Sequence, residues 1–164
     1  VNHLSFPGEY GTIYEFNTNE IIDHGILETT SNHIVRKVEH IPSGHLMAIK
    51  YLIIPQTKYK ESENEKQLKS LMSELETFYM LWECPEIVDC YGYCIHEGHV
   101  LLCMEMMDMS LRKLYIEVRD KREVFAETLV GYIFVKIINA LVFCKEKGIM
   151  HRDIKPNNIL INKK

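Results

Sequence analysis

The chain has 164 residues, which is enough for one ordinary domain with a sizeable core. Hydrophobic residues make up 46% and charged residues 26% of it, a composition typical of a soluble globular protein and not of a disordered or fibrous one. The formal net charge of -4 gives no electrostatic reason to expect nucleic acid or an anionic membrane as a partner.

Three strands are predicted in the first third of the chain. Residues Val1 to Glu20 show neither helical nor strand periodicity, so we expect an irregular lead-in there. Strand patterns follow at Ile21 to Leu27 and at Ile34 to His40, and an apolar run from His45 to Ile54 predicts a third strand. The turn residues Pro42-Ser43-Gly44 separate the second strand from the third.

A helix and two further strands are predicted next. The helix extends from about Glu63 to Trp82, because its apolar residues recur every three or four positions. Cys84-Pro85 ends it, since proline cannot continue a helix. The strands are predicted at Ile87 to Ile95 and at His99 to Glu105, joined by the tight turn Glu97-Gly98.

Two helices complete the predicted elements. Ser110 is expected to cap a short helix that ends near Arg119. A longer helix extends from about Ala126 to Glu146, and Gly148 stands where a C-terminal capping glycine belongs. Five strands with one inserted helix, followed by two helices, make this an α+β pattern.

The most specific motif is the stretch His151-Arg152-Asp153-Ile154-Lys155-Pro156-Asn157-Asn158. It resembles the catalytic loop of protein kinases, in which an Asp accepts the proton of the substrate hydroxyl and an Asn five residues later holds Mg²⁺. By this resemblance, Asp153 is the catalytic base and Asn158 the metal ligand. Lys155 resembles the lysine of serine/threonine-type kinases and would stabilise the transferring phosphoryl group.

The stretch Met47-Ala48-Ile49-Lys50 resembles the V-A-I-K element of kinases, whose lysine neutralises the α- and β-phosphates of ATP. In that family a Glu from the following helix holds the lysine. Glu74 is the predicted partner of Lys50, and Glu76 is the alternative, because helix register read from sequence shifts easily by a residue.

A methionine-rich stretch follows the last predicted strand. By resemblance, Met104 is the gatekeeper beside the nucleotide, while Glu105 and Met107 belong to the hinge whose backbone meets adenine. The same resemblance adds three residues that line the nucleotide: Leu27, Val35 and Ala48.

Three stretches narrow the resemblance to mitogen-activated protein kinase kinases, and among these to the p38- and JNK-activating branch. They are His40 to Lys50, Cys103 to Leu111 with its C-M-E-x-M-D-x-S-L pattern, and Lys155 to Asn158. The resemblance covers roughly Ile21 to Asn162. It implies a dual-specificity kinase that uses ATP and Mg²⁺ to phosphorylate a MAP kinase in stress signalling, downstream of a MAP kinase kinase kinase.

The predicted fold is therefore protein-kinase-like and α+β: a five-stranded antiparallel N-lobe sheet with one helix, then the first helices and catalytic loop of an incomplete C-lobe. The expected divisions are an irregular lead-in at 1–20, the N-lobe at 21–105, and the hinge with a partial C-lobe at 106–164. The chain begins with Val, and only six residues, with no Asp-Phe-Gly element, follow Asn158, so we expect a fragment. Such a chain would expose the apolar face of its long helix, and we expect it to be poorly soluble or unstable alone.

The glycine-rich turn of kinases is the main departure from the family pattern. Its three glycine positions hold Glu28, Thr30 and His33, which adds a negative charge near a triphosphate and removes the freedom of glycine at positive φ. We expect nucleotide binding to be weakened and not abolished, and the alternative function is a catalytically impaired pseudokinase, or a fragment, that acts only as a binding module. Gly8 to Gly11 imitates half such a turn, but it lies 39 residues before Lys50 at its nearest, so chance or a rearranged copy is the preferred interpretation.

Cysteine usage and hydropathy bound the location of the chain. The five cysteines form no CxxC pair and no Cys/His metal spacing, so we expect buried thiols in a reducing compartment. The longest apolar segment, Leu129 to Cys144, is interrupted by Lys136 and Asn139, and we expect it to be too short and too amphipathic to span a bilayer. A cytoplasmic location is the expectation.

Overall fold

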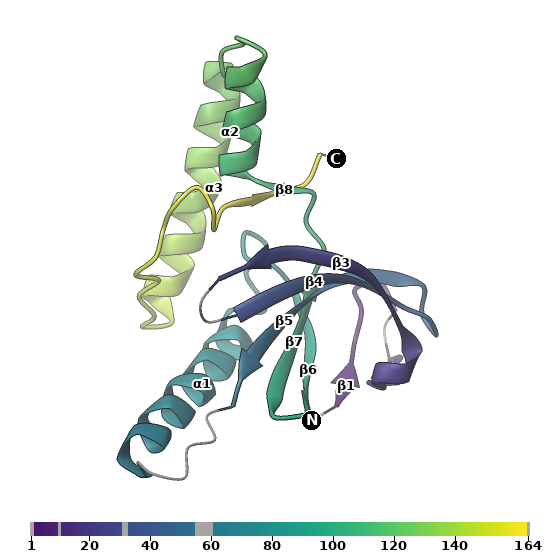
Figure 1. Ribbon diagram of the computed structural model, residues 1–164. Coiled ribbons are helices and arrows are strands. Elements are labelled where there is room, and N and C mark those ends of the chain that lie inside the picture. Colours follow the sequence, from purple (N-terminus) through teal and green to yellow (C-terminus); the bar gives the residue numbers. More distant parts are fainter. Residues whose placement is uncertain (1, 10, 31–32, 55–60, 164) are drawn as a thin grey trace. The chain divides into compact units, whose positions relative to one another are not determined.

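The computed structural model describes residues 2–9, 11–30, 33–54 and 61–163 (Figure 1). The chain divides into two compact units. The first consists of Val1–Tyr79 and Asp89–Met106, and the second of Met80–Val88 and Met107–Lys164.

The first unit is built on a five-stranded antiparallel sheet with the order β3-β4-β5-β7-β6. The five predicted strands and the helix between the third and fourth are confirmed. The tight turn between the last two strands is also confirmed, because Glu97 and Gly98 both have positive φ, 47° and 74°, as a two-residue hairpin turn requires. The strands are β3 (Ile21–Thr29), β4 (His33–His40), β5 (His45–Ile53), β6 (Cys90–His96) and β7 (His99–Glu105).

The fourth predicted strand begins later than expected, at Cys90 and not at Ile87. The amide of Ile87 donates instead to the carbonyl of Cys84 at 3.1 Å, which closes a turn after the helix. A turn that leaves a helix competes for the backbone groups that a strand would need, and apolar residues alone do not reveal this.

Helix α1 (Glu61–Leu81) covers one face of the sheet (Figure 1). Its residues Leu71 and Leu75 pack against Leu52 of β5 and Val100 of β7, which explains the apolar spacing seen in the sequence. Side chains alternate along β5, so Ala48, Lys50 and Leu52 share the face that α1 covers.

The opposite face of the sheet is covered by the N-terminal segment, which forms β1 (His3–Leu4), β2 (Tyr14–Glu15) and the 3-10 helix η1 (Thr18–Glu20). Three apolar side chains of this segment, Leu4, Phe6 and Phe16, are buried in one cluster with side chains of the sheet. The sheet contributes Val38, Met47, Ile49, Leu101 and two cysteines to this cluster. The segment thus has only short regular elements, and it supplies part of the core of the first unit, which the sequence pattern did not predict.

Backbone hydrogen bonds attach the N-terminal segment to β6. The amides of Asn2 and Ser5 donate to the carbonyls of Tyr93 and Tyr91 at 3.1 and 2.9 Å. Between these two contacts lies Gly92, with a φ of 148°, and a Cβ built there would overlap the His3 carbonyl oxygen. Only glycine therefore allows the segment to approach β6 so closely.

The second unit contains α2 (Leu111–Asp120), α3 (Glu127–Glu146) and a small pairing of β8 (Met109–Ser110) with β9 (Leu160–Ile161). The predicted cap is confirmed, because the Ser110 side chain accepts a hydrogen bond from the Lys113 amide at 3.2 Å. Gly148, with φ at 72°, ends α3 as predicted, and the Gly148 and Ile149 amides donate to the carbonyls of Lys145 and Cys144 at 3.0 and 2.8 Å.

Most of α3 is exposed in the described structure. Among the described residues, α3 is the one helix that is long and apolar enough to cross a membrane by length and composition alone. An 18-residue stretch of it has a mean hydropathy of 1.7, and 6% of that stretch is buried. The expectation that this segment is too short and too amphipathic was wrong by length and composition, because the helix has 20 residues and an 18-residue stretch of it is apolar enough. Core helices of globular domains pass the same test.

All five cysteines are free thiols, four of them buried and Cys90 partly so. Burial raises the pKa of the Cys94 thiol to about 11 and that of Cys103 well above its usual value. Both thiols therefore stay protonated and unreactive near neutral pH. Within the part of the chain that the structure describes, no group of three or more His, Cys, Asp or Glu side chains could hold a metal ion.

Candidate functional site

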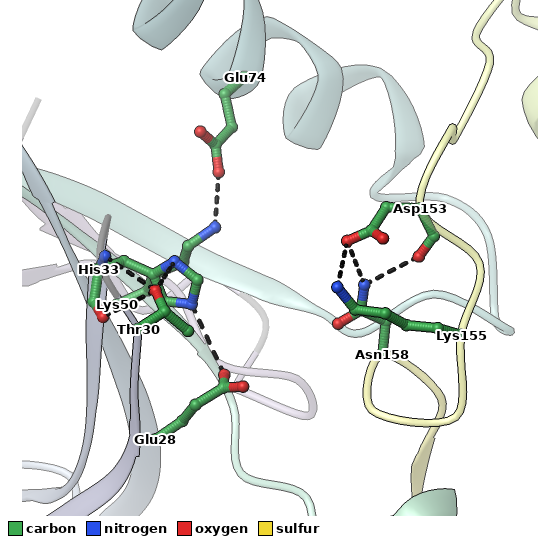
Figure 2. Close-up of polar contacts among 8 residues, drawn as sticks. All are labelled: Glu28, Thr30, His33, Lys50, Glu74, Asp153, Lys155 and Asn158. Atoms are coloured by element: carbon green, nitrogen blue, oxygen red, sulfur yellow. Dashed lines mark hydrogen bonds and ion pairs between the residues drawn. The ribbon is translucent and has the colours of Figure 1, made fainter.

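Strand β5 and helix α1 bring Lys50 and Glu74 together in the first unit (Figure 2). Lys50 Nζ donates to Glu74 Oε1 at 2.7 Å, and the two side chains are 20% and 36% exposed. The predicted contact with Glu74 is confirmed, while Glu76 lies on an exposed part of the helix. The ion pair fixes the position of the Lys50 ammonium group. Because that group has three N–H donors, it can bind an anion while it also donates to Glu74.

Four of the predicted nucleotide-binding residues share one face of the sheet. Val35 lies opposite Lys50 in the β4–β5 pairing, and Ala48 lies opposite Met104 in the β5–β7 pairing. Side chains of directly opposed residues project from the same face. Register therefore brings these apolar side chains to the face that carries the Lys50 ammonium, and their contact with a nucleotide remains a prediction.

The other predicted nucleotide-binding residues lie at the margins of the sheet. Leu27 falls in a register irregularity between Ile26 and Glu28, and its side chain is 48% exposed. Glu105 ends β7, where its amide donates to the Asp89 carbonyl at 2.8 Å. Met107 is assigned to the second unit. Their roles also remain predictions.

The turn that replaces the glycine-rich pattern is closed by side chains. The Thr30 amide donates to the His33 carbonyl at 2.9 Å, and the His33 amide donates to Thr30 Oγ1 at 3.2 Å. The two side chains also meet, with Thr30 Oγ1 3.1 Å from His33 Nδ1. On its other side the imidazole faces a carboxylate, with His33 Nε2 3.6 Å from Glu28 Oε2 (Figure 2).

The predicted catalytic loop holds Asp153 between Lys155 and Asn158 in the second unit (Figure 2). Lys155 Nζ lies 2.9 Å from Asp153 Oδ2. Asn158 Nδ2 donates to both the backbone carbonyl and Oδ2 of Asp153, each at 2.8 Å. The three residues that the sequence predicts to act together are therefore in mutual contact.

These two donors determine the protonation of Asp153. The hydrogen bond from Lys155, followed by that from Asn158, lowers the pKa of the Asp153 carboxyl below its usual value. Asp153 is therefore ionised near neutral pH and can accept a proton. Both of these donors contact Oδ2, and the side chain that carries the other carboxylate oxygen, Oδ1, is exposed, as a base that must reach a substrate hydroxyl requires.

The loop fits a magnesium ion by its donor chemistry. Because the Asn158 amide nitrogen is directed at Asp153, its Oδ1 projects from the other side of the amide carbon. An amide oxygen and a neighbouring carboxylate are the oxygen ligands that Mg²⁺ prefers in proteins, and the ion keeps several waters in addition. Asn158, the predicted metal ligand, would hold such an ion through this oxygen.

Backbone contacts that the sequence did not predict support the loop. The carbonyls of Pro156 and Ile159 accept hydrogen bonds from the Arg112 and Leu111 amides of α2, at 3.1 and 2.7 Å. Asp108 Oδ2 accepts from the Lys163 amide at 2.7 Å. The Asp in the C-M-E-x-M-D-x-S-L pattern was the only available signal, because backbone pairing over more than forty residues leaves no local periodicity.

Comparison with known proteins matches residues 30–164 to the protein kinase domain family. The dual specificity mitogen-activated protein kinase kinase sek-1 of Caenorhabditis elegans is 37% identical over 131 residues, which are 79% of this chain and 37% of that protein. The dual specificity mitogen-activated protein kinase kinase hemipterous of Drosophila melanogaster is 29% identical over 155 residues, which are 94% of this chain and 12% of that protein. Dual specificity mitogen-activated protein kinase kinase 7 of Rattus norvegicus is 29% identical over 155 residues, with 94% of this chain and 35% of the relative covered.

The chain thus spans between about one eighth and two fifths of the length of these curated relatives, with 12% to 37% of each covered. The match with the domain family includes the whole of α3. We therefore read α3 as a helix of this domain and not as a membrane span.

Proposed function

Because the chain belongs to the protein kinase family, we propose that it transfers the γ-phosphoryl group of ATP to hydroxyl side chains of a protein substrate. Protein kinases in general use ATP with Mg²⁺ for this reaction. The observation that carries the proposal is the arrangement of the catalytic loop, where Lys155 and Asn158 hold an ionised Asp153.

In this proposal, Asp153 orients the substrate hydroxyl and accepts its proton as the oxygen attacks the phosphorus. Lys155, 2.9 Å from Asp153, stabilises the negative charge on the transferring phosphoryl group. Asn158 offers its amide oxygen to the Mg²⁺ ion, whose chemistry is to neutralise phosphate oxygens when it is bound.

The first unit supplies the anchoring of the nucleotide. The Lys50 ammonium would neutralise the α- and β-phosphates, and Glu74 would hold it in place for that contact. Met104 and Ala48 form an apolar cross-strand pair suited to the face of an adenine ring.

We further propose that the substrate is a MAP kinase and that an upstream MAP kinase kinase kinase activates the protein. Three relatives with 29% to 37% identity carry the name dual specificity mitogen-activated protein kinase kinase. Dual specificity means that both a threonine and a tyrosine would be phosphorylated.

The proposal is tested by incubating the purified protein with Mg-ATP and a catalytically inactive MAP kinase, followed by mass spectrometry of the substrate. We expect phosphate on a threonine and a tyrosine, and none with Asp153→Asn. Asp120→Asn is the matched control, because Asp120 is an exposed carboxylate of α2 that should not affect transfer. A folded protein that binds the MAP kinase without phosphorylating it would contradict the proposal and favour a binding module.

A further inference from the structure

The turn between β3 and β4 has a feature that a glycine turn cannot have, namely a closed set of side-chain contacts. Glu28, Thr30 and His33, here called the turn clasp, occupy the three glycine positions of the family pattern. His33 is central to it, since its Nδ1 lies 3.1 Å from Thr30 Oγ1 and its Nε2 lies 3.6 Å from Glu28 Oε2 (Figure 2). The His33 side chain is 24% exposed, so the contacts hold it in partial burial.

Strand register places Glu28 on the nucleotide face of the sheet. Glu28 lies opposite Val35, and Val35 lies opposite Lys50. Opposed residues share a face, so the Glu28 carboxylate and the Lys50 ammonium project from the same side. With two strand spacings between them, their backbones are separated by about 10 Å.

A bare carboxylate at this distance from Lys50 would oppose any polyphosphate that Lys50 attracts. The carboxylate and the phosphates carry like charges and repel each other over a distance comparable to the Debye length, so solvent and salt screen the repulsion only in part. The Glu28 side chain is 48% exposed, which limits the strength of the repulsion and does not remove it. The imidazole of His33 is the group that faces this carboxylate.

We propose that the turn clasp controls nucleotide affinity, with His33 engaging the Glu28 carboxylate so that it does not repel the phosphates bound by Lys50. Glu28 is then the residue that weakens binding, and His33 is a positioning residue that acts through Glu28. This inference rests on the proposed function, because it requires that Lys50 binds the phosphates of ATP.

Backbone geometry adds to the role of the clasp. In a glycine turn the amides are available to phosphate oxygens. Here the Thr30 and His33 amides already donate within the turn, at 2.9 and 3.2 Å. These two amides are therefore already engaged and not free for phosphates, so charge on the nearby side chains has a correspondingly larger share in affinity.

The test is calorimetric titration of the protein with Mg-AMP-PNP, a non-hydrolysable ATP analogue, in a double-mutant cycle of Glu28→Gln and His33→Ala. We expect Glu28→Gln to tighten binding about fivefold and His33→Ala to weaken it about fivefold, the size of effect that one unit charge has at about 10 Å in a partly solvated site. In the Glu28→Gln background, His33→Ala should have almost no further effect, since no carboxylate remains to be engaged.

The matched control is His24→Ala. His24 Nε2 lies 3.2 Å from Glu39 Oε2 across the same two strands, with exposures of 38% and 37%, but away from the turn. We expect no change in affinity for this variant. The inference would be overturned if His33→Ala weakened binding equally with and without Glu28. It would also be overturned if the protein bound the analogue and neither clasp substitution changed the affinity. Both results would leave the proposed function standing.

A different outcome would separate the inference from the proposed function. If neither the parent nor a Glu28→Gly, Thr30→Gly and His33→Gly triple variant binds Mg-AMP-PNP while both retain native circular dichroism, the proposed function fails and the inference fails with it. If the parent binds and Lys50→Met abolishes binding, the premise stands and the double-mutant cycle decides.

Discussion

Removal of the Phe6 side chain should strongly lower the free energy of unfolding of the first unit, although Phe6 lies near the N-terminus. Phe6 is only 3% exposed, and its ring lies 4.3 Å from His45, 5.0 Å from Tyr91 and 5.6 Å from His40, measured between centroids. Phe6→Ala leaves a cavity among these rings, and substitutions of this kind cost about 3–5 kcal/mol. Folded domains are stable by roughly 5–15 kcal/mol in total, so this is a large fraction.

The assay is hydrogen exchange followed by mass spectrometry on peptides from β5 and β7, which report opening of the sheet. Ile13→Ala is the matched control from the same segment, because Ile13 is 68% exposed and its truncation should cost less than about 0.5 kcal/mol. If Phe6→Ala lost as little protection against hydrogen exchange as Ile13→Ala, the conclusion that the N-terminal segment belongs to the core would be refuted.

Three further predictions concern titration and packing. Burial lowers the pKa of His40, so at mildly acidic pH the unfolded state binds more protons than the folded state. The free energy of unfolding should therefore fall as the pH drops below about 6.5. Urea titrations between pH 7 and pH 5 should show a weaker pH dependence of that free energy in His40→Leu. Lys155→Met removes the main cause of the lowered Asp153 pKa, and ¹³C NMR should show the Asp153 carboxyl titrating at higher pH, whereas an unchanged midpoint would contradict the contact. Gly92→Ala should detach the N-terminal segment, because the added Cβ overlaps the His3 carbonyl oxygen; limited proteolysis should cleave that segment faster, and unchanged cleavage would contradict this packing.

Periodicity predicted most of the sheet and helices because each of those elements buries a regular face. Leu71 and Leu75 are one helical turn apart, and both pack on the sheet, so their spacing carries the signal. The Lys50–Glu74 contact could be predicted by resemblance to the kinase pattern, but only the structure decides between Glu74 and the alternative Glu76.

The N-terminal segment could not be predicted in this way. Leu4, Phe6 and Phe16 are buried together, but they are separated by irregular intervals, and the segment is fixed by bonds to β6 from Asn2 and Ser5. Contacts formed across about ninety residues leave no local pattern. The glycine at position 92, which permits the approach, resembles any other strand glycine in the sequence.

The turn clasp could be predicted only in part. Its position could be counted back from Lys50, and the negative charge of Glu28 could be recognised. The contact of that carboxylate with the His33 imidazole could not, because it depends on side-chain rotamers across a turn. This contact leads to our proposal that His33 engages the Glu28 carboxylate, whereas the sequence indicated only a residue without the conformational freedom of glycine.

The catalytic role of Asp153 is tested most directly by the rate of a single turnover. The protein, loaded with Mg-ATP, is mixed in a quench-flow instrument with an excess of inactive MAP kinase, and phosphate transfer is timed for the parent and for Asp153→Asn. Loss of a positioned general base costs about 10²–10⁴-fold, so we predict a rate ratio in that range with unchanged nucleotide affinity. Equal transfer rates for the two proteins, or no transfer by a folded parent that binds Mg-ATP, would contradict the account.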